Sequence, residues 1–361
     1  MKKILIANIF GIGDVLFTTP LLANLKKAFP DAAVDYMCNA RTCQILRNDP
    51  LINKVFVYEK DEYAEMWKRS KTEFFKRIFA SLSEIKGNRY DAVFDFTLSR
   101  EFNVFFFAAG IKKRIGFDYK RRGLFLTHKM RIPCFAGRHV IEHYLDLLKY
   151  AGVDPEIRNM RISVNKAAEE WADAYFAAHG LDGKKTVAVI PGGGASWGGH
   201  AGRKRWGSDK FACVADDLVQ NSYQVAVFGD AKEKEICDEV VAVMRHKGIP
   251  VETGMDINKY IAVLNKCRLV LCNDGGPLHI AVALGKSTVS LFGPVDPNVY
   301  GPYPWDGNHV VVTKGGLECR PCYSNFRLPQ CDKDMMCLNG IDPDLVAEEV
   351  KRLLKVHAAG K

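Results

Sequence analysis

The sequence lacks any apolar run long enough to cross a membrane. Its longest aromatic stretch, Phe102 to Ala109, is far shorter than the roughly 18 to 20 apolar residues that a transmembrane helix requires. Met1-Lys-Lys leads straight into Ile4-Leu-Ile-Ala without a cleavage-site pattern, so we expect a first strand there and no signal peptide. Eleven cysteines, an odd and mostly scattered set, argue against a disulfide framework and for a reducing cytoplasm.

The chain also lacks the motifs of several function classes. The turn Gly11-Ile-Gly-Asp14 is not a dinucleotide fingerprint, because that pattern requires glycine where Leu16 stands. No internal repeat, low-complexity tract, recognition helix or RNA-binding motif is present. Asp332-Lys-Asp334 and Asp342-Pro-Asp344 do not follow strands, so we discount them as metal ligands. We therefore predict no cofactor, no metal and no nucleic-acid partner.

Positive charge is present in excess and is unevenly distributed. The net charge is +9, yet residues 1–150 hold 26 Lys/Arg against 16 Asp/Glu, whereas residues 151–361 hold 25 against 26. Eight basic residues face one acid between Lys112 and Arg131. Guanidinium groups suit phosphates and carboxylates, so this segment predicts either an oxyanion-binding surface or a solvated loop. Nucleic acid, anionic lipid and a phosphorylated glycolipid all fit the charge alone.

Strand and helix patterns alternate in both halves of the 361 residues, which predicts two doubly wound α/β domains. The stretch from Gly152 to Ser163 has the character of a linker. Between about Glu62 and Ile85 we expect one amphipathic helix, because Trp67, Phe74, Ile78 and Leu82 recur at helical spacing among basic residues. Such a helix either packs on its own core or lies on an anionic membrane surface.

The stretch from Leu269 to Pro297 reads as strand, glycine turn, short helix, strand and loop. Pro277 fits the first helical turn and Gly285 ends the helix. Two glycines at the carboxyl end of a strand let a ligand approach the backbone, and a helix N-terminus attracts an anion such as a diphosphate. The alternative is an ordinary crossover with a glycine-rich turn.

Asp274-Gly-Gly-Pro-Leu-His279, followed by Leu291-Phe-Gly-Pro-Val-Asp296-Pro, resembles the nucleotide-sugar signature of glycosyltransferase family 9, the heptosyltransferases. Gly275 stands where that family usually has Ser or Thr, so a backbone N–H must replace a hydroxyl contact to the phosphates. Gly13-Asp-Val-Leu-Phe-Thr-Thr-Pro20 and Lys113-Arg-Ile-Gly-Phe117 also resemble family segments.

The resemblance implies the GT-B fold, with two Rossmann-like domains facing across a cleft. We expect an acceptor-binding domain at residues 1–160, a nucleotide-sugar-binding domain at 161–341, and a helix at 342–361 that crosses back to the first domain. The resemblance further implies that the protein transfers heptose from ADP-heptose to the inner core of lipopolysaccharide, with inversion and without a metal ion. That phosphate-rich acceptor agrees with the basic N-terminal half. Cytoplasmic location follows, with peripheral contact at the inner face of the inner membrane left open.

The site residues divide into three groups. Asp14 matches the family's presumed general base, although helix capping is the commonest role for Asp at such a position, and Lys204 matches the lysine that neutralises the leaving diphosphate. The expected donor-binding residues are Gly192, Gly193, Glu233, Asp274, Gly275, Gly276 and His279. The expected acceptor-binding residues are Gly13, Thr18, Lys113, Arg114, Arg121 and Arg122. We assign Asp274 to orienting its loop or contacting the sugar, and we note that His279 can equally be a buried helix residue.

Four C-terminal cysteines stay open to interpretation. They follow the spacing Cys319, Cys322, Cys331 and Cys337. Thiolates so grouped can ligate zinc or an iron–sulfur cluster, but the last two are too widely spaced for a paired Cys-x-x-Cys site. A similar loop in some heptosyltransferases implies a disulfide brace or reduced thiols instead.

Other functions compete with heptose transfer. A nucleotide-sugar epimerase or another transferase of this fold would use a different donor, and an epimerase would not need the basic N-terminal half. A non-catalytic homologue would bind nucleotide without turnover, which Gly275 and the long loop Ser196–Arg203 would suit.

Overall fold

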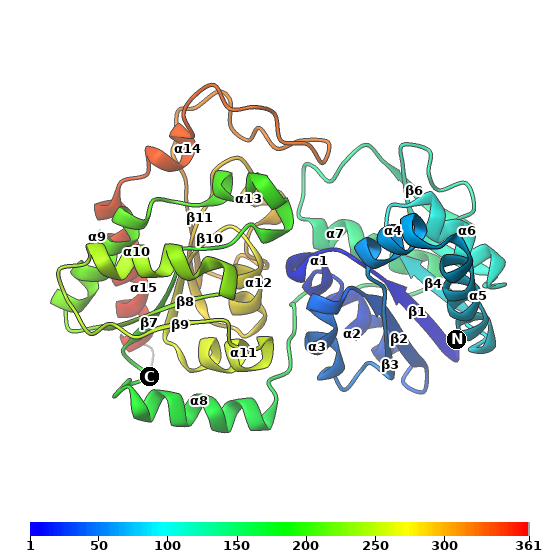
Figure 1. Ribbon diagram of the computed structural model, residues 1–361, viewed down its shortest axis with the longest axis horizontal. Coiled ribbons are helices and arrows are strands. Elements are labelled where there is room, and N and C mark those ends of the chain that lie inside the picture. The colour runs from blue at the N-terminus through cyan, green and yellow to red at the C-terminus, as the bar shows by residue number, and fades with distance from the viewer. Residues whose placement is uncertain (360–361) are drawn as a thin grey trace. The chain divides into compact units, whose positions relative to one another are not determined.

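The computed structural model describes residues 1–359, and residues 360 and 361 of the expected C-terminal segment lie outside the described part. The chain divides into two compact units, Met1–Arg161 and Ile162–Lys361. Each unit is built on one sheet of six parallel strands flanked by helices (Figure 1). The predicted doubly wound α/β class is confirmed.

The first unit has the strand order β3-β2-β1-β4-β5-β6. Its strands are β1 (Lys3–Ala7), β2 (Ala33–Cys38), β3 (Lys54–Val57), β4 (Ala92–Asp95), β5 (Lys113–Tyr119) and β6 (His128–Ile132). Its helices are α1 (Ile12–Leu16), α2 (Thr19–Ala28), α3 (Ala40–Arg47), α4 (Lys60–Arg69), α5 (Lys71–Gly87), α6 (Arg100–Ala108), α7 (Val140–Leu145) and η1 (Asp146–Ala151). The central strand β1 is apolar and buried because neighbouring strands and helices cover it on all sides.

The second unit has the strand order β12-β11-β10-β7-β8-β9. Its strands are β7 (Thr186–Ile190), β8 (Gln224–Gly229), β9 (Val251–Thr253), β10 (Leu269–Asn273), β11 (Ser287–Leu291) and β12 (His309–Val312). Its helices are α8 (Lys166–Ala178), η2 (Ala195–Lys204), α9 (Ser208–Gln220), η3 (Ala231–Glu233), α10 (Lys234–Val243), α11 (Ile257–Lys266), α12 (Gly276–Ala283), α13 (Pro297–Tyr300), α14 (Met336–Asn339) and α15 (Pro343–Ala359). Helices α9, α10 and α15 form one helical layer, and α8, α11 and α12 form another.

The last helix, α15, is packed within the second unit. Helix α15 packs against α9, β10 and β11 of its own unit, and the expected crossing back to the first domain stays a prediction. Its apolar stripe, including Val346, Val350 and Leu353, is buried in the core that β7, β10 and β11 share. This burial of an amphipathic face makes the helix part of the second unit.

The segment expected to form one amphipathic helix forms two. Helix α4 ends at Arg69 and α5 begins at Lys71, because Ser70 has an extended backbone and its hydroxyl accepts a hydrogen bond from the N–H of Glu73. Ser70 is therefore an N-cap that the aromatic periodicity concealed. Among the residues described, no helix combines the length and hydrophobicity that crossing a bilayer requires.

Candidate functional site

In the second unit, the loops that follow β7 and β10 lie side by side. The two strands are neighbours, so their carboxyl ends reach the same edge of the sheet. A Cβ atom on Gly275 would lie 3.4 Å from the backbone nitrogen of Gly194. Asn273, at the end of β10, donates its amide to the carbonyls of Pro191 at 2.8 Å and Gly192 at 2.9 Å. The structure thus brings together the glycines expected to bind the donor.

Asn273 also accepts a hydrogen bond from the N–H of Trp206 at 3.0 Å. One buried amide therefore fixes three segments that are distant in the sequence. Sequence reasoning missed this residue, because an asparagine at the end of an apolar strand gives no local sign of its distant partners.

Glu233 braces the first glycine loop. Its Oε1 atom accepts a hydrogen bond from the N–H of Gly193 at 2.5 Å, and its Oε2 atom accepts one from the N–H of Asp230 at 3.1 Å. A Cβ atom on Gly192 would lie 2.2 Å from the Glu233 carboxyl carbon, so only glycine fits beside this buried carboxylate. Arg205, also missed from the sequence, donates to the Gly193 carbonyl at 2.9 Å and lies 3.3 Å from Glu233 Oε1.

Lys204 and Asp274 form a buried ion pair at this edge. The distance from Lys204 Nζ to Asp274 Oδ2 is 2.6 Å, and the two side chains are 9% and 5% exposed. The ammonium group also lies 4.4 Å from the centre of the Trp197 ring. The aspartate supplies the compensating charge that a buried lysine needs when no anionic ligand is bound. This ion pair gives Asp274 a role, which is to hold Lys204. The sequence did not indicate that role, because an aspartate beside a diphosphate is repelled by it.

Helix α12 begins directly after the second glycine loop. Gly275 is its N-cap, and Gly276 and Pro277 occupy its first turn. The N–H groups of this first turn have no partner within the helix and point toward the sheet edge. His279 is 4% exposed, which agrees with the interpretation of a buried helix residue.

In the first unit, Asp14 lies on α1 at the carboxyl edge of β1. It is not the N-cap, which is Gly11, but the third helical residue. Its Oδ2 atom accepts a hydrogen bond from the N–H of Gly11 at 3.2 Å, and the residue is only half-buried. Asp14 therefore closes the start of the helix while part of it stays accessible to a substrate.

Two buried asparagines hold the loop that carries Asp14. The amide of Asn8 donates to the Asp14 carbonyl at 3.0 Å, and its oxygen accepts from the N–H of Phe10 at 3.1 Å. The amide of Asn39 donates to the carbonyls of Ile9 at 3.0 Å and Phe10 at 2.6 Å. Neither asparagine was expected from the sequence, since each acts through backbone partners that only the fold brings near.

The register of β5 separates the basic residues expected to bind the acceptor. Lys113 pairs with Ala92 and Arg114 with Val93, at the start of β4, so both lie at the amino edge of the parallel sheet. Arg121 and Arg122 follow the end of β5 and lie at the carboxyl edge, where Asp14 is. A strand rises about 3.3 Å per residue, so roughly 20 Å separates the two groups.

The Arg114 side chain is held by neighbouring groups at the amino edge of the sheet. Its Nε atom donates to the Phe125 carbonyl at 2.6 Å, and its guanidinium carbon lies 5.2 Å from the centre of the Phe107 ring. Lys113 and Arg114 therefore lie at a different edge of the sheet from Arg121 and Arg122, and the acceptor-binding role of each pair stays a prediction. The sequence concealed the separation because β5 itself lies inside the basic segment.

Thr18 is the other expected acceptor contact that the structure places elsewhere. It is fully buried, and its hydroxyl lies 2.6 Å from the Val15 carbonyl and 2.7 Å from the Tyr36 hydroxyl. Burial raises the pKa of Tyr36 well above its ordinary value, so both hydroxyls are core hydrogen-bonding groups. Gly13, next to Asp14, is half-buried and stays at the accessible edge.

All eleven cysteines, including Cys319, Cys322, Cys331 and Cys337, are free thiols. Within residues 1–359, no group of three or more His, Cys, Asp or Glu residues is arranged to hold a metal ion. Hydrogen bonds from the N–H groups of Lys333 and Met335 lower the pKa of the Cys331 thiol, whereas burial raises the pKa of Cys322 and Cys337. The four cysteines are therefore chemically unequal.

Sequence comparisons extend over nearly the whole chain. Lipopolysaccharide heptosyltransferase 3 of Escherichia coli is 25% identical over 353 residues, covering 96% of this chain and 98% of that protein. Lipopolysaccharide heptosyltransferase 2 of E. coli strain K12 is 25% identical over 367 residues, with 98% of each chain covered.

Solved structures show the same fold. A glycosyltransferase family 9 structure from Veillonella parvula DSM 2008 matches with a TM-score of 0.81 and 24% identity, covering 98% of this chain and 97% of that one. The E. coli ADP-heptose lipopolysaccharide heptosyltransferase II matches with a TM-score of 0.74 and 22% identity, covering 99% and 100%. These likenesses confirm the expected GT-B fold class.

The model of glycosyltransferase family 9 (heptosyltransferase) matches residues 78–330, which is more than half of the chain and includes both glycine loops, Lys204 and Glu233. Together with the relatives, this match confirms the family that the sequence motifs resembled. The chain belongs to glycosyltransferase family 9, the heptosyltransferases, and is a glycosyltransferase.

Proposed function

We propose that the protein transfers a heptose from ADP-heptose to the inner core of lipopolysaccharide, with inversion of the anomeric centre and without a metal ion. The observation that carries the proposal is the edge of the second unit, where two glycine loops, a helix N-terminus and the buried Lys204 converge. Relatives at 25% identity are named lipopolysaccharide heptosyltransferases. A structural neighbour, E. coli heptosyltransferase WaaC, was solved with ADP.

The donor's diphosphate would bind to the glycine loops. Gly275 and Gly276 offer backbone N–H groups at the start of α12, where the helix dipole favours negative charge. No side chain at Gly275 stands between a phosphate and the backbone, which makes up for the hydroxyl that other family members have at this position. Gly192 and Gly193, braced by Glu233 and Arg205, would form the opposite wall of the donor site.

Lys204 would change partners when the donor binds. Its ammonium group is held by Asp274 at 2.6 Å, so it is already at the sheet edge before a ligand arrives. A diphosphate carries more charge than one carboxylate, and Lys204 would move toward it as negative charge develops on the leaving group. In this scheme Asp274 is a positioning residue, which holds the lysine in place.

Asp14 would be the general base. Its partly exposed carboxylate is fixed by the Gly11 N–H and would take the proton from the acceptor hydroxyl as that oxygen attacks the anomeric carbon. Attack on the face opposite the leaving diphosphate inverts the centre. Arg121 and Arg122, at the same edge of the first unit's sheet, would bind acceptor phosphates or carboxylates.

The donor assignment is tested by calorimetric titration of the protein with ADP, UDP and GDP, each with and without EDTA. We expect binding to be tightest for ADP and unchanged by EDTA. Preference for UDP or GDP would move the protein to another donor. Binding of ADP without heptose transfer to a lipopolysaccharide acceptor would favour a non-catalytic homologue, and isomerisation of the donor would favour an epimerase.

The base is tested by Asp14→Asn. The amide oxygen of asparagine can still accept the Gly11 N–H, so the loop should fold, but the side chain can no longer take a proton. We expect the transfer rate to fall by roughly 10²- to 10⁴-fold, while the Kd for ADP stays within about twofold. Full transfer activity in this variant would remove Asp14 from the mechanism.

A further inference from the structure

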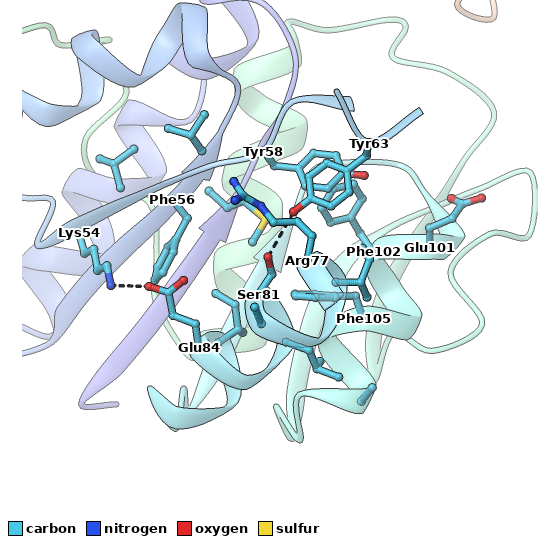
Figure 2. Close-up of a pocket in the computed structure, with 18 of the residues that line it drawn as sticks. Lys54, Phe56, Tyr58, Tyr63, Arg77, Ser81, Glu84, Glu101, Phe102 and Phe105 are labelled. Atoms are coloured by element: carbon cyan, nitrogen blue, oxygen red, sulfur yellow. Dashed lines mark hydrogen bonds and ion pairs between the residues drawn. The ribbon is translucent and has the colours of Figure 1, made fainter. Parts of the chain in front are cut away.

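A long groove of about 630 Å³ runs through the first unit between the edge strand β3 and helices α5 and α6 (Figure 2). Its walls are mainly aromatic and aliphatic: Met37, Phe56, Tyr58, Tyr63, Ile78, Leu82, Ile85, Phe102 and Phe105. Sites for organic ligands typically have this composition and occupy about 300 to 1,000 Å³. The functions assigned above do not use this groove.

The groove exists because α5 is incompletely packed. The helix has 17 residues, yet Ile85 is its one buried residue. Ile78 and Leu82 face the groove and are only half-buried, although the core beside them, formed by Phe56, Phe106 and others, is closed. Protein interiors are normally close-packed, so an open apolar space beside a closed core indicates a ligand that completes it.

The shape of the groove fits a linear ligand. Lys54 and Glu84, joined by an ion pair of 2.8 Å, line it at the amino edge of the sheet, and Tyr58 and Glu101 line it at the carboxyl edge. Figure 2 shows this ion pair at one end and the rings of Tyr58, Tyr63 and Phe102 gathered at the other. From Lys54 to Tyr58 the strand spans about 13 Å. The second end lies at the carboxyl edge of the sheet, which is also the edge that carries Asp14.

The charges around the groove favour an anionic amphiphile. Arg47 and Arg77 line it and are exposed, and within residues 1–359 neither forms an ion pair, whereas Lys54 is paired with Glu84. The Glu101 carboxylate accepts a hydrogen bond from the Ser99 hydroxyl, which lowers its pKa. Trp67 on α4 and Phe75 and Phe79 on α5 are 44%, 47% and 64% exposed, as expected where helices meet a lipid surface.

We propose that this groove holds an acyl chain of the glycolipid acceptor. The inference rests on the proposed function and extends it, because the acceptor would be recognised by its lipid as well as by its sugar. The chain would lie along β3 beneath α5. Its polar end would emerge at the carboxyl edge, where Arg121, Arg122 and Asp14 receive the sugar. The groove thus ties the lipid part of the acceptor to the edge where the hydroxyl reacts.

Binding of cis-parinaric acid, a fluorescent fatty acid, tests the groove directly in the full-length protein. We expect micromolar binding by the wild type and at least a tenfold loss in Ser81→Trp, which places an indole inside the groove. Ser83→Trp is the matched control, because Ser83 is exposed on the same helix and does not line the groove; it should bind like the wild type. Absence of wild-type binding, or equal binding by both variants, would overturn the proposal.

Competition identifies the source of the chain without relying on a variant. We expect the acylated acceptor to displace the probe, its deacylated form to leave the probe bound, and phosphatidylglycerol to displace it at least tenfold less well. Equal displacement by phosphatidylglycerol would overturn the assignment to the acceptor, and displacement by the deacylated form would overturn the acyl-chain site.

Titration of the same samples with ADP separates this inference from the proposed function. Ser81→Trp should bind ADP like the wild type, because the residue belongs to the other unit. If the wild type binds ADP but does not bind the probe, the acyl-chain proposal is overturned and the donor assignment stands. If the acylated acceptor displaces the probe but the wild type does not bind ADP, the donor assignment is overturned and the acyl-chain proposal stands.

Discussion

Gly192 shows how a single position can depend on the absence of a side chain. Its missing Cβ leaves room for the Glu233 carboxyl group, which an added methyl would approach to 2.2 Å. We expect Gly192→Ala to displace Glu233, release the Gly193 N–H and weaken ADP binding by roughly tenfold or more, since a hydrogen bond to a charged group contributes about 1.5 to 3 kcal/mol. Calorimetry measures the change.

Gly199→Ala is the matched control for that variant. No heavy atom lies within 4 Å of a Cβ atom placed on Gly199, so ADP affinity should stay within about twofold of the wild type. Equal affinity in Gly192→Ala would show that the glycine loop does not need Glu233 to bind the donor.

Asp95 makes the stability of the first unit depend on pH. Burial raises its pKa from 3.8 to about 6, although Thr97 and Asn103 donate hydrogen bonds to it. Because the folded pKa lies above the unfolded one, Asp95 contributes stability that is complete below about pH 3.8 and is lost as the pH rises through 6. At neutral pH the buried carboxylate therefore destabilises the fold.

We expect Asp95→Asn to remove this dependence. The new amide can donate to Asn103 Oδ1, a buried atom that lacks a hydrogen-bond partner in the described structure. Urea unfolding should show the wild type gaining roughly 1 to 2 kcal/mol relative to the variant between pH 7.5 and pH 5. An unchanged difference across that range would contradict the raised pKa.

The sequence predicted residues whose chemistry is local and missed those whose role depends on distant partners. Asp14, Lys204 and the glycine loops stand in motifs that specify their own surroundings. Asn8 and Asn273 act by donating to carbonyls from other segments. The glycine pattern therefore indicated the two candidate site edges, but it could not reveal what holds them.

At the scale of elements, strand register decides which basic residues can act together. Sequence proximity groups Lys113 with Arg121, but β5 lies between them and carries them to opposite edges of the sheet. The alternation of strands and helices was predictable because buried parallel strands are continuous apolar runs. Strands β5 and β6 were not, because Lys113 and Arg114 begin β5 and Lys129 and Arg131 interrupt β6. The helix boundary at Ser70 was not predicted, because aromatic residues at helical spacing continue from α4 into α5.

This register gives a test with matched charge. Arg121→Ala/Arg122→Ala removes two positive charges at the carboxyl edge, whereas Lys112→Ala/Lys113→Ala removes two at the amino edge. We expect the first pair to raise the acceptor KM by about tenfold or more, because charge-assisted hydrogen bonds are lost, and the second pair to change it less than twofold. Equal effects would mean that overall charge, not the edge, attracts the acceptor.

At the scale of the whole molecule, the two units differ in core and in charge. Each has its own sheet and its own buried cluster, and the basic excess lies in residues 1–150. The residues proposed to bind ADP all belong to the second unit. We therefore predict that the first unit recognises the acceptor and that the second unit binds the donor.

We therefore expect scanning calorimetry of the full chain to resolve two unfolding transitions, of which ADP raises only one. At 100 times its Kd a ligand adds about 2.7 kcal/mol, which corresponds to roughly 5 to 10 °C for a unit of this size. Asp95→Asn should shift the other transition, which assigns each transition to its unit. A single transition would contradict the separate unfolding of the units, and an equal ADP shift in both transitions would show that the donor site draws on both units. Lys204, Asp274 and the glycine loops would then not be sufficient to bind ADP.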